Sequence, residues 1–128
     1  MTGPILARMT STVRIDAAAP YPAAFFLGRA HRIVHGNGAF LAAFGASSVG
    51  QPAREALVDL PSAAFDVMDA VLRSGRPLAR RLVLADRPYR FVVAPRRDPE
   101  TGETYGVASH LRPLDVPTAD AARGSRQA

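Results

Sequence analysis

The sequence predicts an α+β domain, a five-stranded antiparallel sheet with short helices and one longer helix inserted between strands two and three. Three observations lead to this prediction. Two short apolar segments flank a turn after residue 23, apolar residues recur at helical spacing between residues 62 and 75, and after Pro77 they alternate with a period of two. Since roughly 100 to 200 residues usually form one domain, the 128 residues are expected to hold one.

The first two strands are expected to form a hairpin. Residues 25–27 are apolar, residues 28–31 suit a turn, and residues 32–35 return to a strand-like composition. Asn37 follows, and its side-chain oxygen can accept the free amides of a short helix. Gly45 is expected to end that helix.

The long helix is predicted to begin at Ser62, which can cap it, and to end at Gly75. A short amphipathic piece, residues 54–60, precedes it. Asp69 is expected on its polar side, where it can pair with Arg73 one turn later. The apolar stripe of the helix consists of Phe65, Met68 and Leu72, with Ala64, Val67 and Val71 beside it.

The last three strands are predicted at residues 78–85, 89–95 and 104–111. Turn residues at positions 86–88 and 98–103 join them. Because consecutive strands joined by short turns pair with one another, these three are expected to form an antiparallel meander.

The two ends of the chain differ in composition from its centre. Residues 1–22 mix small residues with prolines and are interpreted as an N-terminal arm. Residues 115–128 lack periodicity and are expected to be a disordered tail. The folded domain is therefore predicted to span residues 23–114.

Composition excludes several kinds of chemistry. The chain has no cysteine, so disulfides, thiolate metal sites and cysteinyl-flavin photochemistry are absent. All 16 basic residues are arginine, which gives a net charge of +5 and a pI near 10.9. Since they are scattered rather than clustered, no nucleic-acid partner is expected. No apolar run reaches signal-peptide or membrane-helix length, so a cytoplasmic protein without a membrane partner is expected.

Four segments, taken in order, resemble a PAS domain with its PAC motif. Residues 32–45, which begin Arg-Ile-Val-His-Gly-Asn-Gly-Ala-Phe and end Phe-Gly, are similar to the family's G-R-I-x-x-x-N-x-A-F…(F/T)-G segment. Residues 49–57, Val-Gly-Gln-Pro through Glu-Ala-Leu, resemble V-G-(R/K)-P…E-x-x-P. Residues 71–77, Val-Leu-Arg-Ser-Gly-Arg-Pro, resemble V-(L/Y)-x-(T/S)-G-x-P. Residues 91–107 resemble the PAC core, P-(L/V)-R-D-x-x-G-x-(V/I)-x-G-(V/I), and the chain looks like an actinobacterial-type member.

The resemblance implies a ligand site between the sheet and the helices that follow strand two. The helices would supply Phe40, Phe44, Leu57, Phe65, Met68 and Leu72 to that site. The sheet would supply Leu82, Leu84, Phe91, Val93, Val107 and Ser109. The alternative interpretation is that these side chains pack on one another, because close-packed cores are the default in proteins.

His35 is the candidate polar contact in that site. It has the same strand parity as Ile33, so in a regular strand it faces the helices and can offer a hydrogen bond or a metal nitrogen. The family's haem-binding members take their axial histidine mainly from the inserted helices, and residues 39–77 contain no histidine. No haem, metal or other cofactor is therefore expected.

No catalytic group is predicted. Ser109 and His110 are neighbours, but adjacent residues on a strand point to opposite faces and cannot form a nucleophile and base pair. The acidic residues of the long helix are expected to be solvated. The protein is therefore expected not to be an enzyme.

The outer face of the sheet is the candidate interface. The residues that point to this face are small and apolar, and an apolar sheet face is normally covered by another element or a partner. A homodimer is predicted through Val83, Val92, Ala94 and Ala108. The arginines between residues 80 and 97 are interpreted as a solvated surface.

The function predicted from these features is a stand-alone sensory or interaction module. It would bind a small apolar or aromatic ligand and act through a separate signalling protein, because no output domain accompanies the predicted fold. Two alternatives stay open: a small cavity protein that serves small-molecule metabolism as an enzyme or accessory, and a ligand-free dimerisation scaffold.

Overall fold

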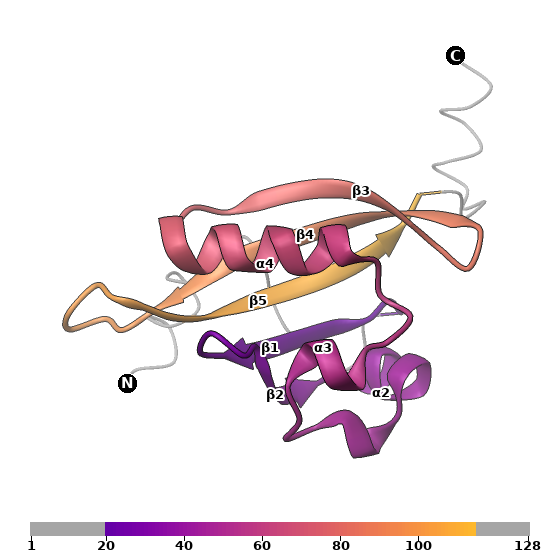
Figure 1. Ribbon diagram of the computed structural model, residues 1–128, viewed down its shortest axis with the longest axis horizontal. Helices are drawn as coiled ribbons and strands as arrows, with labels where there is room; N and C mark the ends of the chain where they lie inside the picture. Colours follow the sequence, from indigo (N-terminus) through magenta and orange to yellow (C-terminus); the bar gives the residue numbers. More distant parts are fainter. Residues whose placement is uncertain (1–19, 115–128) are drawn as a thin grey trace, which may run out of the picture.

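The computed structural model describes residues 20–114, which form one five-stranded antiparallel sheet and its helices (Figure 1). The elements, in chain order, are β1 (Ala23–Leu27), β2 (Arg32–Gly36), α2 (Gly38–Phe44), the 3-10 turn η1 (Ala46–Ser48), α3 (Ala53–Ala56), α4 (Ser62–Ser74), β3 (Leu78–Leu84), β4 (Arg87–Arg97) and β5 (Thr104–Pro113). The strand order across the sheet is β2-β1-β5-β4-β3. The predicted fold class is confirmed, while the predicted arm (apart from residues 20–22) and tail lie outside the described residues.

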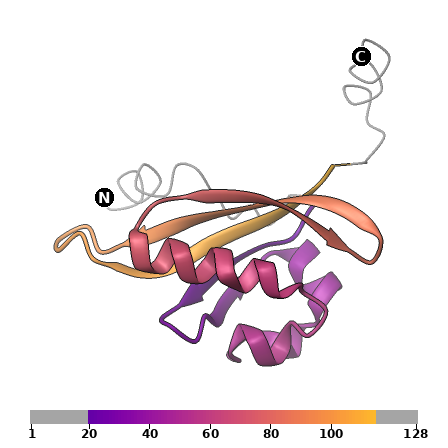
Figure 2. The same cartoon turned by 45° about the horizontal axis from the view of Figure 1, so that its top comes forward.

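All the helices lie on one face of the sheet (Figures 1 and 2). The long helix α4 crosses β3, β4 and β5, and α2 lies against β1 and β2. The first and last strands, β1 and β5, are paired at the centre of the sheet. Within residues 20–114, no helix is long and apolar enough to cross a membrane.

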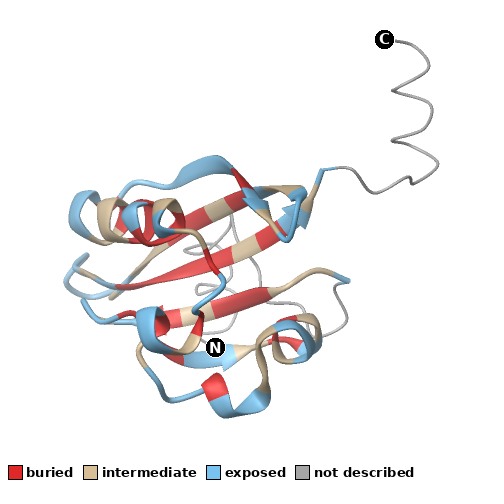
Figure 3. Ribbon diagram, turned by 45° about the vertical axis from the view of Figure 1, so that its right-hand side comes forward, coloured by how far each residue is buried: buried red, intermediate tan, exposed pale blue. Residues whose placement is uncertain are grey.

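The core lies between α4 and the inner face of the sheet, where buried residues line both layers (Figure 3). Met68 and Val71 from the helix and Val93 and Val107 from the strands are fully buried. The apolar stripe of α4, which has the predicted helical period of 3.6 residues, therefore meets the apolar side chains of the strands, which alternate with a period of two. Their contact forms one apolar layer and removes most of the surface of these side chains from water.

Asn37 ties the helical segment to the first strand. Its side-chain oxygen accepts hydrogen bonds from the amide of Phe40, at 2.9 Å, and from the amide of Ala23, at 3.0 Å. Its side-chain nitrogen donates to the carbonyl of Tyr21 at 3.0 Å. The predicted cap is confirmed, and the buried amide also fixes the entry of β1.

Gly75 ends α4 in the left-handed conformation, with φ of 71°, as the sequence predicts. The beginning of the helix differs from the prediction, because Pro61 occupies the cap position and no side chain accepts the free amides there. Ser62 is instead the first helical residue. Proline sets the extended backbone needed at this entry, which leaves no cap role for Ser62.

The turn between β3 and β4 begins one residue earlier and ends two residues earlier than the predicted turn at residues 86–88. Ala85 and Asp86 form it, with φ of 52° and 65°, and Pro88 is part of β4, opposite Val83. A two-residue turn with both central residues at positive φ matches the twist of paired strands, so it extends the hairpin to its tip. The sequence prediction placed the turn at the proline, but the pairing geometry determines its position.

Candidate functional site

Twelve of the thirteen predicted ligand-binding residues are buried or partly buried, but only five of them, Phe40, Phe44, Leu57, Phe91 and Ser109, line the interior void. Eight are buried in the core, namely Phe40, Leu57, Phe65, Met68, Leu82, Phe91, Val93 and Val107. Phe44, Leu72 and Leu84 are partly buried against it, and Ser109 is buried on β5. His35 is the exception.

His35 lies on the other face of the sheet, contrary to the prediction. The pairing of β1 with β2 runs from Phe25 opposite His35 to Phe26 opposite Ile33, so Val34 is an extra residue in β2. A bulge of this kind reverses the alternation of side chains beyond it. His35 is therefore exposed, with its ring 6.0 Å from that of Phe25, and does not face the helices.

The interior at the predicted site contains a void of about 10 Å³. It is lined by Pro22, Phe26, Phe40, Phe44, Leu57, Leu60, Phe91, Ser109 and Leu111. This volume is at the lower limit for one water molecule, roughly 10 to 15 Å³, so the side chains are close-packed as they stand. Ser109 provides the one polar side chain in this lining.

The short helical segments between β2 and α4 bury few side chains. In α2 only Phe40 is buried, and its ring lies 4.9 Å from that of Phe44 on the next turn. The turn η1 buries only Ser48, and α3 buries only Ala53. Segments with few buried apolar side chains open locally at lower free energy than the core does. We refer to α2, which supplies Phe40 and Phe44 to the lining, as the roof of the void, and we expect it to be the most easily displaced wall.

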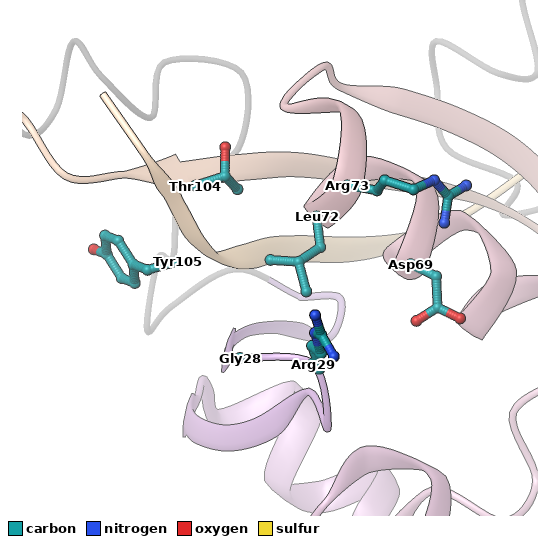
Figure 4. A pocket seen from close by; sticks show the side chains of 7 residues that line it. All are labelled: Gly28, Arg29, Asp69, Leu72, Arg73, Thr104 and Tyr105. Atoms are coloured by element: carbon teal, nitrogen blue, oxygen red, sulfur yellow. The ribbon is translucent and has the colours of Figure 1, made fainter. Parts of the chain in front are cut away.

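A larger, open groove of about 620 Å³ lies between α4, the β1–β2 turn and the beginning of β5 (Figure 4). Its lining residues are Gly28, Arg29, Asp69, Leu72, Arg73, Thr104 and Tyr105. Leu72 lies at the centre of the groove, above Arg29 (Figure 4). The groove thus combines an apolar centre with charged walls.

A hydrogen-bonded triad stands at one side of the groove. Nε2 of His31 donates to Oδ1 of Asp69 at 2.7 Å, and Nη2 of Arg54 donates to Oδ2 of the same carboxylate at 2.8 Å. His31 is fully buried, whereas the side chains of Arg54 and Asp69 are 50% and 37% exposed. The triad joins the β1–β2 turn, α3 and α4 at one carboxylate.

Two opposing effects determine the pKa of Asp69. Burial raises the pKa, but the hydrogen bonds from Arg54 and His31 and their positive charges lower it, and the net result is below the ordinary value of 3.8. Asp69 is therefore a carboxylate at neutral pH. Since a carboxylate only accepts, the histidine nitrogen facing it carries the hydrogen.

Sequence reasoning missed this triad. Asp69 was expected to pair with Arg73 or with water, but its partners are 38 and 15 positions away, and no spacing rule connects them. His31 was interpreted as an ordinary turn residue. No sequence signal marks the contact, and the positive φ of His31, 51°, is visible only in the structure.

The outer sheet face is partly covered by the chain itself. Of the predicted dimer residues, Ala94 and Ala108 are buried, and Phe25 and Val92 pack against them. The guanidinium carbon of Arg96 lies 3.7 Å from the centre of the Phe25 ring. Val83 is 52% exposed and Val92 is half-buried, so these two remain available to a partner. Self-association through this face stays a prediction.

No group of three or more metal-ligating side chains occurs within the described part of the chain. Ser109 and His110 lie on opposite faces of β5, as expected, since Ser109 lines the interior void and the ring of His110 contacts Tyr21 on the outer face. The two side chains cannot act together as nucleophile and base.

An antiparallel sheet in this strand order, with its helices on one face between the second and third strands, is the PAS fold. The PAS domain of BvgS from Bordetella pertussis is 21% identical, and the match covers 98% of this chain and 96% of that one with a TM-score of 0.64. A sensory box sensor histidine kinase from Vibrio cholerae is 14% identical over 90% of this chain and 98% of that one, also with a TM-score of 0.64. VqmA bound to DPO is 18% identical over 76% of this chain and 54% of that one, with a TM-score of 0.57. No protein-family model and no curated protein sequence matches the chain.

Proposed function

We propose that this protein is a non-enzymatic sensory module in which a small, mainly apolar ligand enters between the sheet and α2, and that binding is transmitted to a separate signalling protein. The observation that carries the proposal is the aromatic-lined void under a thinly anchored roof, at the place where the resemblance to PAS domains puts a ligand. Residues 91–107 would then form the PAC half of the domain.

Ligand entry requires the roof to move, because the void of about 10 Å³ is far smaller than the roughly 300 Å³ at which ligand pockets begin. Displacement of Phe40 and Phe44 would open the space, since both project from the short helix α2. The hydroxyl of Ser109 would orient a ligand by its polar group. The rest of the lining would bind an apolar or aromatic body.

Asn37 provides a route from the roof to the outer sheet face. It caps α2 and bonds the backbone of both Tyr21 and Ala23. The ring of Tyr21 in turn lies 5.4 Å from that of His110 on the outer face. A shift of α2 would therefore move Tyr21, which couples ligand binding to the surface available to a partner.

The test compares two variants at one position. Ser109→Leu places extra methyl groups in the void, whereas Ser109→Ala removes only the hydroxyl. We expect compounds from a panel of fatty and aromatic acids to raise the melting temperature of the wild type and of Ser109→Ala, but not of Ser109→Leu. A ligand at a hundredfold excess over its dissociation constant adds about 2.7 kcal/mol of stability.

Native mass spectrometry provides the second measurement, because a ligand carried through purification adds mass under native but not denaturing conditions. If no compound stabilises the wild type and nothing is bound in the mass spectrum, the ligand proposal fails. An equal response of Ser109→Leu and wild type would also contradict it, since the site would then lie elsewhere.

A second candidate function is a ligand-free interaction module, and the specific observation in its favour is the small volume of the void. In that case the closed packing around Phe40 and Phe91 is the functional state of the core. The same panel separates the two functions, because a module with a filled core gives no ligand-dependent stabilisation.

A further inference from the structure

Three arginines lie in a row across the outer face of the sheet. Arg81 on β3 is directly opposite Arg90 on β4, and Arg90 is directly opposite Arg112 on β5. Directly opposite residues share one face and have Cβ atoms about 4.5 to 5.5 Å apart. All three side chains are exposed. Their neighbour Val92 packs against the buried Ala94 and Ala108 on the same face.

The row is unfavourable for the isolated domain. Like charges directly opposite one another destabilise a sheet. Both ion pairs formed within residues 20–114 involve Asp69, so no carboxylate in the described part of the chain neutralises the row. The guanidinium carbon of Arg112 lies 6.0 Å from the centre of the Tyr21 ring. Charge repulsion that the rest of the fold does not offset is typical of a functional surface.

The field of the row acts on a neighbouring histidine. Burial lowers the pKa of His110, and the charges of Arg112 and Arg90 lower it further below its ordinary value of 6.5. Two members of the row thus act on a group at this face, and the three exposed guanidinium groups give the face a positive charge. An anionic partner would be attracted to it.

Apolar side chains flank the row. Val83 is 52% exposed on β3, and Val92 is half-buried on β4 at the position two residues from Arg90. A surface that presents guanidinium groups beside valines suits a ligand that alternates negative and apolar groups. Arginine forks bind carboxylates in a bidentate manner, and the valines would bury aliphatic side chains.

We propose that this face binds an acidic segment of a partner protein, in which glutamate or aspartate residues pair with Arg81, Arg90 and Arg112 and intervening apolar residues cover Val83 and Val92. A second copy of the chain fits less well, since it would bring a second row of arginines to the contact. Nucleic acid fits less well too, because no exposed aromatic rings alternate with these arginines to stack bases.

The proposal names the kind of partner for the output step proposed above, and in that sense it builds on the proposed function. Its test uses no small ligand. A failure here therefore leaves the ligand site untouched, and a failure of the ligand site leaves this surface testable.

The experiment titrates the full chain, labelled with ¹⁵N, with a peptide of alternating glutamate and valine. A peptide with glutamine in place of glutamate is the ligand control. Arg90→Thr is the test variant, and Arg80→Thr is the matched control. Arg80 precedes Arg81 on β3 and carries the same charge, but it pairs with Phe91 and therefore belongs to the other face of the sheet.

We expect amide shifts confined to the outer-face residues of β3, β4 and β5, with affinity reduced about tenfold or more in Arg90→Thr and less than twofold in Arg80→Thr. Equal losses in both variants, or binding of the glutamine peptide as tight as the glutamate peptide, would overturn the proposal. So would tenfold tighter binding of a single-stranded oligonucleotide of equal charge. A sedimentation experiment in which Arg90→Thr changes a dimer into a monomer, or the reverse, would assign the face to a second copy instead.

Discussion

His31 and Asp69 are 38 positions apart in the chain, yet Nε2 of the histidine lies 2.7 Å from Oδ1 of the carboxylate. The contact fastens the turn between the first two strands to the middle of the long helix. Nδ1 of the same ring is buried with no hydrogen-bond partner among the described residues. The hydrogen bond from Nε2 to Asp69 is thus the one polar contact of the His31 ring among the described residues. Loss of this bond would leave the buried ring without a polar partner.

The two partners of Asp69 should contribute very unequally to stability. We expect His31→Ala to lower the free energy of unfolding by about 3 kcal/mol, because it removes a buried ring and a hydrogen bond to a carboxylate. Arg54→Ala should cost at most about 1 kcal/mol, since that side chain is half exposed. Urea denaturation of both variants measures the difference. If His31→Ala does not fold, His31→Asn, which tolerates positive φ, gives the same comparison. Equal costs for His31 and Arg54 would contradict the assignment of the buried contact as the stronger one.

Asp69 should make stability depend on pH in the acid range. Its pKa is lowered in the folded state, so the unfolded chain binds protons first as the pH falls. The contribution is fully present above about pH 4 and is lost as the pH falls through the lower pKa of the folded protein. We expect Asp69→Asn to be less stable at neutral pH and to show a flatter stability profile below about pH 4. Asp66→Asn, on the exposed side of the same helix, is the control and should keep the profile of the wild type.

The β3–β4 turn can be improved by one substitution. Ala85 adopts a φ of 52° in a two-residue turn, a conformation that asparagine tolerates better than alanine. We expect Ala85→Asn to stabilise the protein by about 0.5 to 1 kcal/mol and Ala85→Val to destabilise it, because a β-branched side chain is strained there. Denaturant midpoints at unchanged slope measure both effects. A gain for Ala85→Val would show that the turn adopts another conformation.

Arg90 should control the titration of His110. Removal of one of the two nearby positive charges in Arg90→Thr should raise the pKa of His110 toward 6.5, though burial keeps it lower. Because a lowered histidine pKa makes stability fall as the pH drops from about 6.5 through the folded-state pKa, the variant should lose less stability over that range. Histidine ring NMR measures the pKa directly. Arg80→Thr has the opposite parity, and an equal shift in that variant would contradict the row of arginines on the outer face.

The sequence predicted the elements because each has a local signal. Asn37 before an apolar helix and Gly75 after one determine helix ends through the bonding of free amides and carbonyls, which depends on neighbours within a few residues. The period-two strands after Pro77 similarly predict which side of the sheet Phe91 and Val107 face. Both are in the core.

The parity of His35 could not be predicted in this way. One extra residue in β2, Val34, reverses the alternation, and the sequence around it carries no mark of a bulge. Its presence depends on the pairing of β1 with β2. The prediction of an inward histidine was therefore wrong for a reason that belongs to strand pairing.

Residue types and short-range spacing were enough to predict the strand and helix order, the apolar stripe of α4 and the absence of thiol chemistry. Three other features become visible only in the folded chain: Asp69 meets His31 and Arg54, the side chains of Arg81, Arg90 and Arg112 form one row, and the space beneath α2 is nearly filled. Each of these depends on the distance between segments far apart in the chain, or on how completely large side chains fill a shared volume. Neither quantity is encoded in a local pattern, since many packings are compatible with the same alternation of polar and apolar residues.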